Sequence, residues 1–225
     1  MIKKRLVPIV STVVKGSDLK VFVAGDDLLS DGHSVKDLSS EVFESSSSRW
    51  ALSGSIPPET DLELGSVTSN GNLYFLTCTP HGALSFNLQE GVWTKIQAPM
   101  PKNLTIPSLV ECSGRIFIVG GATKKTLLDS IRIWELCENA MVWKEVAKVK
   151  NKLFKELYTD SELYFTAVGH GNRIYLSIYK RPQMLAFDIS TRLWFWLPSH
   201  PVAGASEGKL LFCYPFNPNL ISAID

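Results

Sequence analysis

The stretch SGRIFIVGG, residues 113–121, is a short apolar run that follows a glycine and ends in a glycine pair. Its length and its Ile, Phe and Val content predict a buried β-strand. Similar runs recur as SDLKVFVAGD (17–26), NGNLYFLTC (70–78) and GNRIYLSIY (171–179), with a weaker copy in EGKLLFCYPF (207–216). The strand is therefore one part of an internal repeat.

A second element follows each of the first four runs: an aromatic residue, a polar or acidic residue, a turn and a tryptophan. The four tryptophans are Trp50, Trp93, Trp143 and Trp194, with spacings of 43, 50 and 51 residues. A period near 50 residues is typical of a kelch-type propeller blade. Because one four-stranded sheet cannot bury both of its faces alone, we interpret these tryptophans as packing residues between neighbouring blades.

The repeat predicts an all-β chain, a kelch-type β-propeller of about four blades plus one closing strand, forming an incomplete ring. We expect a single domain over residues 1–225, with one helix at 151–158, where a long ordered loop is the alternative. The expected strands are 7–14, 19–25, 40–45 and 49–53 in blade one; 65–70, 72–78, 83–88 and 92–97 in blade two; 107–112, 115–120, 130–136 and 142–147 in blade three; 162–168, 173–178, 183–188 and 193–197 in blade four; and 209–214 as the closing strand.

Charge and cysteine content favour an intracellular chain. The formal net charge is +1, from 23 basic and 22 acidic residues, which predicts no general attraction to nucleic acid or to a membrane. The four cysteines, Cys78, Cys112, Cys137 and Cys213, form no C-x-x-C pair. We interpret them as reduced and largely buried; a zinc site or a disulfide framework is the alternative.

The repeats resemble the kelch region of plant F-box/kelch-repeat proteins. The resemblance lies in KKRLVPIVSTVV, LKVFVAGDD, PSLVECSGRIFIVGG, DSIRIWEL, FKELY, GHGNRIYLSIY and LFCYPFNPNL, and it covers essentially the whole chain. Members of that family are substrate receptors of cullin–RING (SCF) ubiquitin ligases, in which an F-box docks on the ligase adaptor and the propeller binds the substrate. The resemblance therefore implies a protein-interaction module with a substrate protein as its partner.

The sequence departs from the family pattern in two respects. No F-box is recognisable before the first blade, and four blades are fewer than the six or seven usual in kelch propellers. The kelch glycine pair survives only at Gly120 and Gly121. We therefore expect a partial propeller from a truncated gene product, an isoform or a fragment, which without an F-box does not bind the ligase adaptor.

No motif for catalysis or for a cofactor is found. The histidines His33, His81, His170 and His200 lack metal-ligand spacing, and no phosphate-binding loop or nucleophile motif is present. The sequence predicts no metal, no cofactor and no enzymatic activity. The alternatives are a propeller enzyme acting on carbohydrate, of the oxidase or glycosidase type, and a non-functional truncation product.

The candidate binding residues lie in the loops between the second and third strands of each blade, which gather on one rim of a propeller. We expect these loops at 26–39, 78–82, 121–129 and 178–183. They carry Asp26, Asp27, His33, His81, Lys124, Lys125, Lys180 and Arg181. The four basic residues, which lie in adjacent blades, suggest a docking patch for an acidic or phosphorylated peptide; the alternative is that they only solvate turns.

Overall fold

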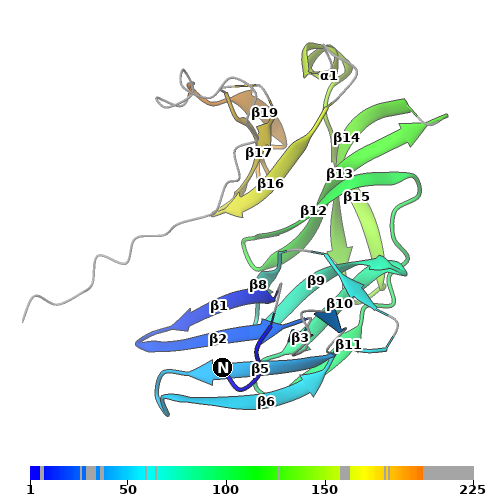
Figure 1. Cartoon of the computed structure of the whole chain (residues 1–225). Coiled ribbons are helices and arrows are strands. Elements are labelled where there is room, and N and C mark those ends of the chain that lie inside the picture. Colours follow the sequence, from blue (N-terminus) through cyan, green and yellow to red (C-terminus); the bar gives the residue numbers. More distant parts are fainter. Residues whose placement is uncertain are drawn as a thin grey trace, which may run out of the picture. The chain divides into compact units, whose positions relative to one another are not determined.

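Figure 1 shows the computed structural model, which describes residues 1–5, 8–25, 27–28, 34–35, 38–58, 60–63, 65–125, 127–157, 163–179, 181 and 183–199. These residues form four consecutive antiparallel sheets, and in each sheet the main strands pair in the order in which they occur along the chain. The all-β, four-bladed kelch arrangement is therefore confirmed. The expected closing strand at 209–214 lies outside the described residues.

The first two blades occupy residues 9–95. Blade one consists of β1 (Ile9–Lys15), β2 (Asp18–Ala24), β5 (Ser39–Glu44) and β6 (Arg49–Ser55), and the short pair β3 (Asp27–Leu28) and β4 (Ser34–Val35) lies between β2 and β5 in the chain. Blade two consists of β8 (Val67–Ser69), β9 (Asn72–Thr79), β10 (His81–Asn87) and β11 (Val92–Lys95); β7 (Asp61–Leu62) also pairs with β9.

The other two blades and the helix occupy residues 104–196. Blade three consists of β12 (Leu104–Cys112), β13 (Arg115–Lys124), β14 (Leu127–Cys137) and β15 (Val142–Lys148), and blade four of β16 (Phe165–His170), β17 (Arg173–Ile178), β18 (Leu185–Asp188) and β19 (Leu193–Trp196). The helix α1 (Asn151–Leu157) connects them and confirms the predicted helix at 151–158. Each predicted strand of the four blades has a counterpart in the structure.

The chain divides into two compact units, which are described separately. The first unit contains residues 1–100 and 136–143, and the second contains residues 101–135 and 144–225. That the chain is a single domain stays a prediction.

In the first unit, the apolar faces of blades one and two share one core. Phe22 of blade one is completely buried, with its ring centroid 4.7 Å from that of Phe86 and 5.8 Å from that of Trp93 in blade two. Trp93 also lies 5.2 Å from Phe75. Trp93 is therefore a packing residue between blades, as the sequence predicts, whereas Trp50 contacts Phe43 of its own blade at 5.4 Å.

The segment 1–5 is fixed to blade one by a buried carboxylate. The side chains of Glu41 on β5 and Arg5 are both fully shielded from solvent, and their charged groups lie 3.0 Å apart. The backbone amides of Ile2 and Lys3 also donate hydrogen bonds to the Glu41 carboxylate. Burial acts to raise the pKa of Glu41, but these two amides and Arg5 outweigh it, so that the pKa lies below its ordinary value.

In the second unit, the inner strands of blades three and four run parallel and in close contact. The Ala167 amide donates a hydrogen bond to the Ser108 hydroxyl at 3.3 Å. A Cβ placed on Gly169 would lie only 1.8 Å from the backbone oxygen of Glu111. The two strands therefore approach so closely that only glycine fits at this position. Trp194 packs on the same core, 4.8 Å from Phe187.

The glycine pair of the opening motif serves close packing. A Cβ on Gly120 would lie 2.4 Å from a methyl carbon of Leu104, and one on Gly121 would lie 2.4 Å from a methyl carbon of Leu128 and 2.8 Å from the Thr105 methyl. The side chains beside β13 thus occupy the space above these two glycines. Trp143, the remaining repeat tryptophan, is half-buried in β15.

In three blades an ion pair joins the second strand to the third. It joins a basic residue at or near the start of the second strand to a carboxylate near the end of the third: Lys20 to Glu44 at 2.6 Å, Arg115 to Glu135 at 3.1 Å and Arg173 to Asp188 at 3.3 Å. In blade two, Asn72 stands opposite Asn87 instead. In three of the four repeats, the acidic residue that follows the aromatic residue is thus held in an ion pair.

We expect the substitution Gly169→Ala to lower the free energy of unfolding by about 3 kcal/mol, because the added methyl group collides with a backbone oxygen that cannot rotate away. The matched control is Gly171→Ala. Gly171 has a φ of +57° and open space around it, so alanine there costs only the strain of the left-handed conformation, about 1 kcal/mol. Denaturant unfolding of both variants measures the difference; equal losses would contradict the close approach of β12 and β16.

We expect Glu41 to make the fold acid-sensitive. Because the pKa of Glu41 is depressed in the folded state, its contribution is present above the ordinary carboxyl value of 4.5 and is lost as the pH falls through the folded value. The substitution Glu41→Gln should lower stability at pH 7 by about 3 kcal/mol, because Arg5 would stay buried without its counter-charge. Stability measured against pH should show a smaller acid-induced loss in this variant; identical profiles would contradict the role of Glu41.

Candidate functional site

The strand directions bring three chain connections to one end of the second unit. The contacts between β12 and β16 advance together along both strands, from Ser108 and Ala167 to Cys112 and Gly171, so the two strands are parallel. Since each blade is antiparallel, the β13–β14 turn, the β15–β16 connection with α1 and the β17–β18 connection all lie at the end where β12 and β16 begin.

This end of the second unit carries many cations. We call it the basic end and define it by Lys102, Lys124, Lys125, Lys150, Lys152, Lys155 and Arg181. The lysines are exposed, and Arg181 is half-buried. Lys102 lies beside Lys124 because the Thr123 amide donates a 3.0 Å hydrogen bond to the Asn103 carbonyl oxygen.

Among the described residues, the carboxylates at the basic end are Asp129 and Glu156. Asp129 is already bound by Lys148 at 3.6 Å and by Arg132 at 3.7 Å. The lysines of the basic end therefore outnumber the described carboxylates near them. Such an excess of described cations favours anionic groups, on a chain whose formal net charge is only +1.

Arg181 has a structural task at this end. Its guanidinium donates a hydrogen bond to the backbone oxygen of Glu156, in the last turn of α1, and its own amide donates to the Ile178 oxygen at 3.0 Å. A cation at the C-terminus of a helix satisfies carbonyl groups that have no partner within the helix. Arg181 thus ties α1 to blade four and fixes the position of the lysines that α1 carries.

The structure describes only some of the residues predicted for binding. Asp26, His33 and Lys180 lie outside the described residues, and of Asp27 only its backbone place in β3, opposite Val35, is described. His81 is exposed in the first unit, where it faces Cys78 across the β9–β10 hairpin.

Two predicted loop ranges are wrong. The range 78–82 contains strand residues on both sides of Pro80, and the range 121–129 contains strand up to Lys124 and from Leu127 onward. The ladder pairs of both hairpins continue to these tips, with Cys78 opposite His81 and Lys124 opposite Leu127. Lys124 therefore lies at the paired end of a hairpin strand rather than in a loop.

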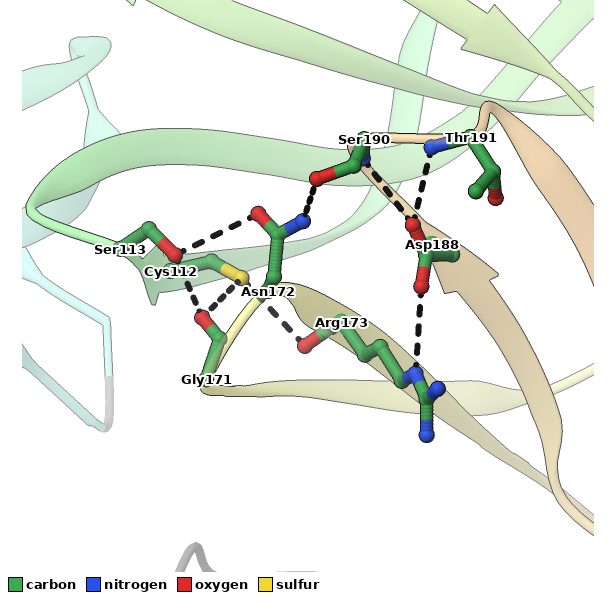
Figure 2. A network of polar contacts seen from close by, with 8 residues as sticks. All are labelled: Cys112, Ser113, Gly171, Asn172, Arg173, Asp188, Ser190 and Thr191. Atoms are coloured by element: carbon green, nitrogen blue, oxygen red, sulfur yellow. Dashed lines mark hydrogen bonds and ion pairs between the residues drawn. The ribbon is translucent and has the colours of Figure 1, made fainter.

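At the opposite end of the second unit, a network of polar contacts joins groups of the protein to one another. Figure 2 shows Asn172 between Ser113 and Ser190, which joins the β12–β13, β16–β17 and β18–β19 turns. The Asp188 carboxylate accepts hydrogen bonds from the Ser190 and Thr191 amides at 3.1 and 2.9 Å and also binds Arg173. The contacts within this network hold turns together.

The thiol within this network is held in its protonated form. Cys112 donates to the backbone oxygens of Gly171 and Arg173 at 3.1 and 3.4 Å. Burial, assisted by the charge of Glu111, raises its pKa to about 11. A thiol in this state is a poor nucleophile at neutral pH.

The described part of the chain offers no group of three or more His, Cys, Asp or Glu side chains placed to hold a metal ion. Cys78, Cys112 and Cys137 are free thiols, and Cys213 lies outside the described residues. Cys112 is buried and Cys137 is half-buried, but the prediction of burial is wrong for Cys78, which is exposed near the end of β9. Nor does any described helix reach the length and apolar character that a membrane crossing requires.

The sequence pattern of the Kelch motif matches residues 103–150, which is blade three with its flanks. The chain is a kelch-containing protein of the plant type. It is 31% identical to the protein UNUSUAL FLORAL ORGANS of Arabidopsis thaliana over 99% of this chain and 54% of that protein.

Two further relatives from Arabidopsis thaliana bear F-box names. F-box only protein 6 is 30% identical over 77% of this chain and 38% of its own length, and an F-box/kelch-repeat protein is 29% identical over 69% of this chain and 41% of its own length. The kelch-containing chain thus spans about half, or less, of the length of the curated relatives that it matches. The blades together with these relatives make it a protein-interaction module.

We expect the cysteines of this kelch-containing chain to differ sharply in reactivity. Cys78 is exposed, so Ellman's reagent should modify it first, whereas Cys112 should react only after unfolding. Peptide mapping by mass spectrometry after brief labelling at pH 8 identifies the modified residue. The variant Cys78→Ser controls for the assignment of the fast phase. Native labelling of Cys112 as fast as that of Cys78 would contradict its burial.

Proposed function

We propose that this chain is the substrate-binding part of an F-box/kelch subunit of a cullin–RING (SCF) ubiquitin ligase and acts inside the cell. The observation that carries the proposal is the succession of four kelch blades in a chain whose relatives include proteins named F-box and F-box/kelch-repeat. In this role the chain performs no covalent chemistry. It holds a substrate protein while the other ligase subunits transfer ubiquitin.

The packing of the blades supports such a role. Strands whose apolar faces are buried against a neighbouring blade form rigid scaffolds, and the connections between strands can then vary without loss of the fold. Several described charged groups away from the basic end form ion pairs within their own blades, as Arg173 and Asp188 show. No observation among the described residues favours the alternative of an enzyme acting on carbohydrate.

The proposal is tested by following the proteins that the chain binds. The tagged chain is expressed in plant cells, bound proteins are captured after crosslinking, and their abundance is measured before and after cullin neddylation is blocked. We expect the bound proteins to carry ubiquitin and to accumulate at least about twofold when the cullins are inactive. Proteins captured equally by the tag alone are subtracted as non-specific.

Bound proteins whose abundance and ubiquitination do not respond to cullin inactivation would contradict the ligase role. Such proteins would still be consistent with a protein-interaction module. One experiment therefore distinguishes the ligase role from protein binding in general.

A further inference from the structure

We propose that the basic end of the second unit is a docking surface for an extended segment of a partner protein that is rich in Asp and Glu and contains apolar residues. The inference rests on the proposed function, because it names the chemistry by which a substrate would be recognised. It is carried by three features of the surface: its charge, the exposed apolar side chains within it and the rigidity of the elements that present it.

The charge favours carboxylates spread along a chain. The cations come from four separate pieces of the second unit: Lys102 before β12, Lys124 and Lys125 at the β13–β14 hairpin, Lys150, Lys152 and Lys155 on and before α1, and Arg181 after β17. Lysine is a compact point charge on a flexible stem and binds carboxylates without strict geometry. Exposed charge pairs are weak individually, so affinity must come from several pairs together.

The same features argue against a single phosphate group as the main determinant. Phosphate recognition typically uses arginine forks or converging backbone amides that bind several oxygens at once. The guanidinium of Arg181, the one described arginine of the basic end, donates to the Glu156 backbone oxygen. A distributed acidic segment therefore matches this surface better than a phosphorylated residue.

Two apolar side chains are exposed among these cations. Leu127 stands directly opposite Lys124 in the hairpin and is 68% exposed. Tyr164, just before β16, is 49% exposed and packs edge-on against Tyr179 with ring centroids 6.4 Å apart. Exposed apolar groups within a charged rim are typical of binding surfaces, where aromatic side chains act as anchors. They indicate that the bound segment carries apolar residues between its acidic ones.

The surface is also held in place before binding. The hairpin pairing continues to Lys124 and Leu127, while Leu157 buries the end of α1 in the core and Arg181 binds its last turn. A surface that is already ordered loses little conformational entropy on binding. The ordering cost then falls mainly on the extended partner segment.

The test measures binding of a fluorescein-labelled twelve-residue peptide of Asp and Glu with one central Leu and one central Phe, by fluorescence anisotropy. We expect the triple variant Lys102→Glu/Lys124→Glu/Lys125→Glu to weaken binding at least about tenfold, and Leu127→Ser about threefold. The matched control is Lys4→Glu/Lys95→Glu/Lys144→Glu, which makes the same charge change at exposed lysines outside the basic end and should weaken binding less than twofold. Unfolding midpoints show that the variants are folded.

Equal affinity of the two triple variants would overturn the proposal, as would equal binding of a peptide in which Asn and Gln replace Asp and Glu. Tighter binding of duplex DNA than of the acidic peptide would overturn it in favour of a nucleic-acid surface. A gain above about tenfold when phosphoserine replaces three of the acidic residues would overturn it in favour of a phosphate site. If the peptide does not bind while captured proteins still respond to cullin inactivation, this surface is wrong and the proposed function stands.

Discussion

The whole structure depends on the burial of apolar side chains on the blade faces that meet within each unit. Phe22 is a clear example of this burial. Its ring belongs to blade one, and it contacts the rings of Phe75, Phe86 and Trp93 of blade two. A single four-stranded sheet would leave this apolar face exposed to water. Each Å² of apolar area left exposed would forgo about 25 cal/mol of stabilisation. Within each unit, two successive blades bury such faces against one another, so that each core contains side chains from both blades.

Close packing at the inner strands is the second consequence. Where β12 meets β16, Gly169 leaves no room for a side chain, and the turns beyond it are joined by Ser113 and Asn172. The sequence GHG at 169–171 therefore uses its two glycines for different reasons: the first for a close backbone approach and the second for a positive φ in the turn.

Strand positions could be predicted from the sequence, because the apolar runs and the aromatic–turn–tryptophan elements are local and each blade repeats them. The sequence of 151–158 leaves a helix and an ordered loop open, since eight residues carry too little pattern to separate the two. The burial of Leu157 and the hydrogen bond from Arg181 stabilise the helix. The predicted loops at 78–82 and 121–129 failed because polar residues at a hairpin tip, such as His81 and Lys124, give the same signal in a strand as in a loop. Strand pairing, which is non-local, separates the two.

The residues of the basic end, like the strand pairing, are brought together by contacts that local sequence does not predict. Lys124, Lys125 and Arg181 could be proposed from the loop pattern, but Lys102 precedes a strand and Lys150, Lys152 and Lys155 surround a helix, so nothing in their local sequence relates them to one another. They share one end of the second unit only because β12 and β16 run parallel and every sheet between them is antiparallel. The charge of this surface is thus a product of topology. A chain with a net charge of +1 presents it, while Arg115 and Arg173 are paired with carboxylates inside their own blades. The cations of the basic end are thus separate in the fold from the cations that form ion pairs within blades. An acidic partner is then attracted to one end of the second unit, because the paired cations are neutralised by their own carboxylates.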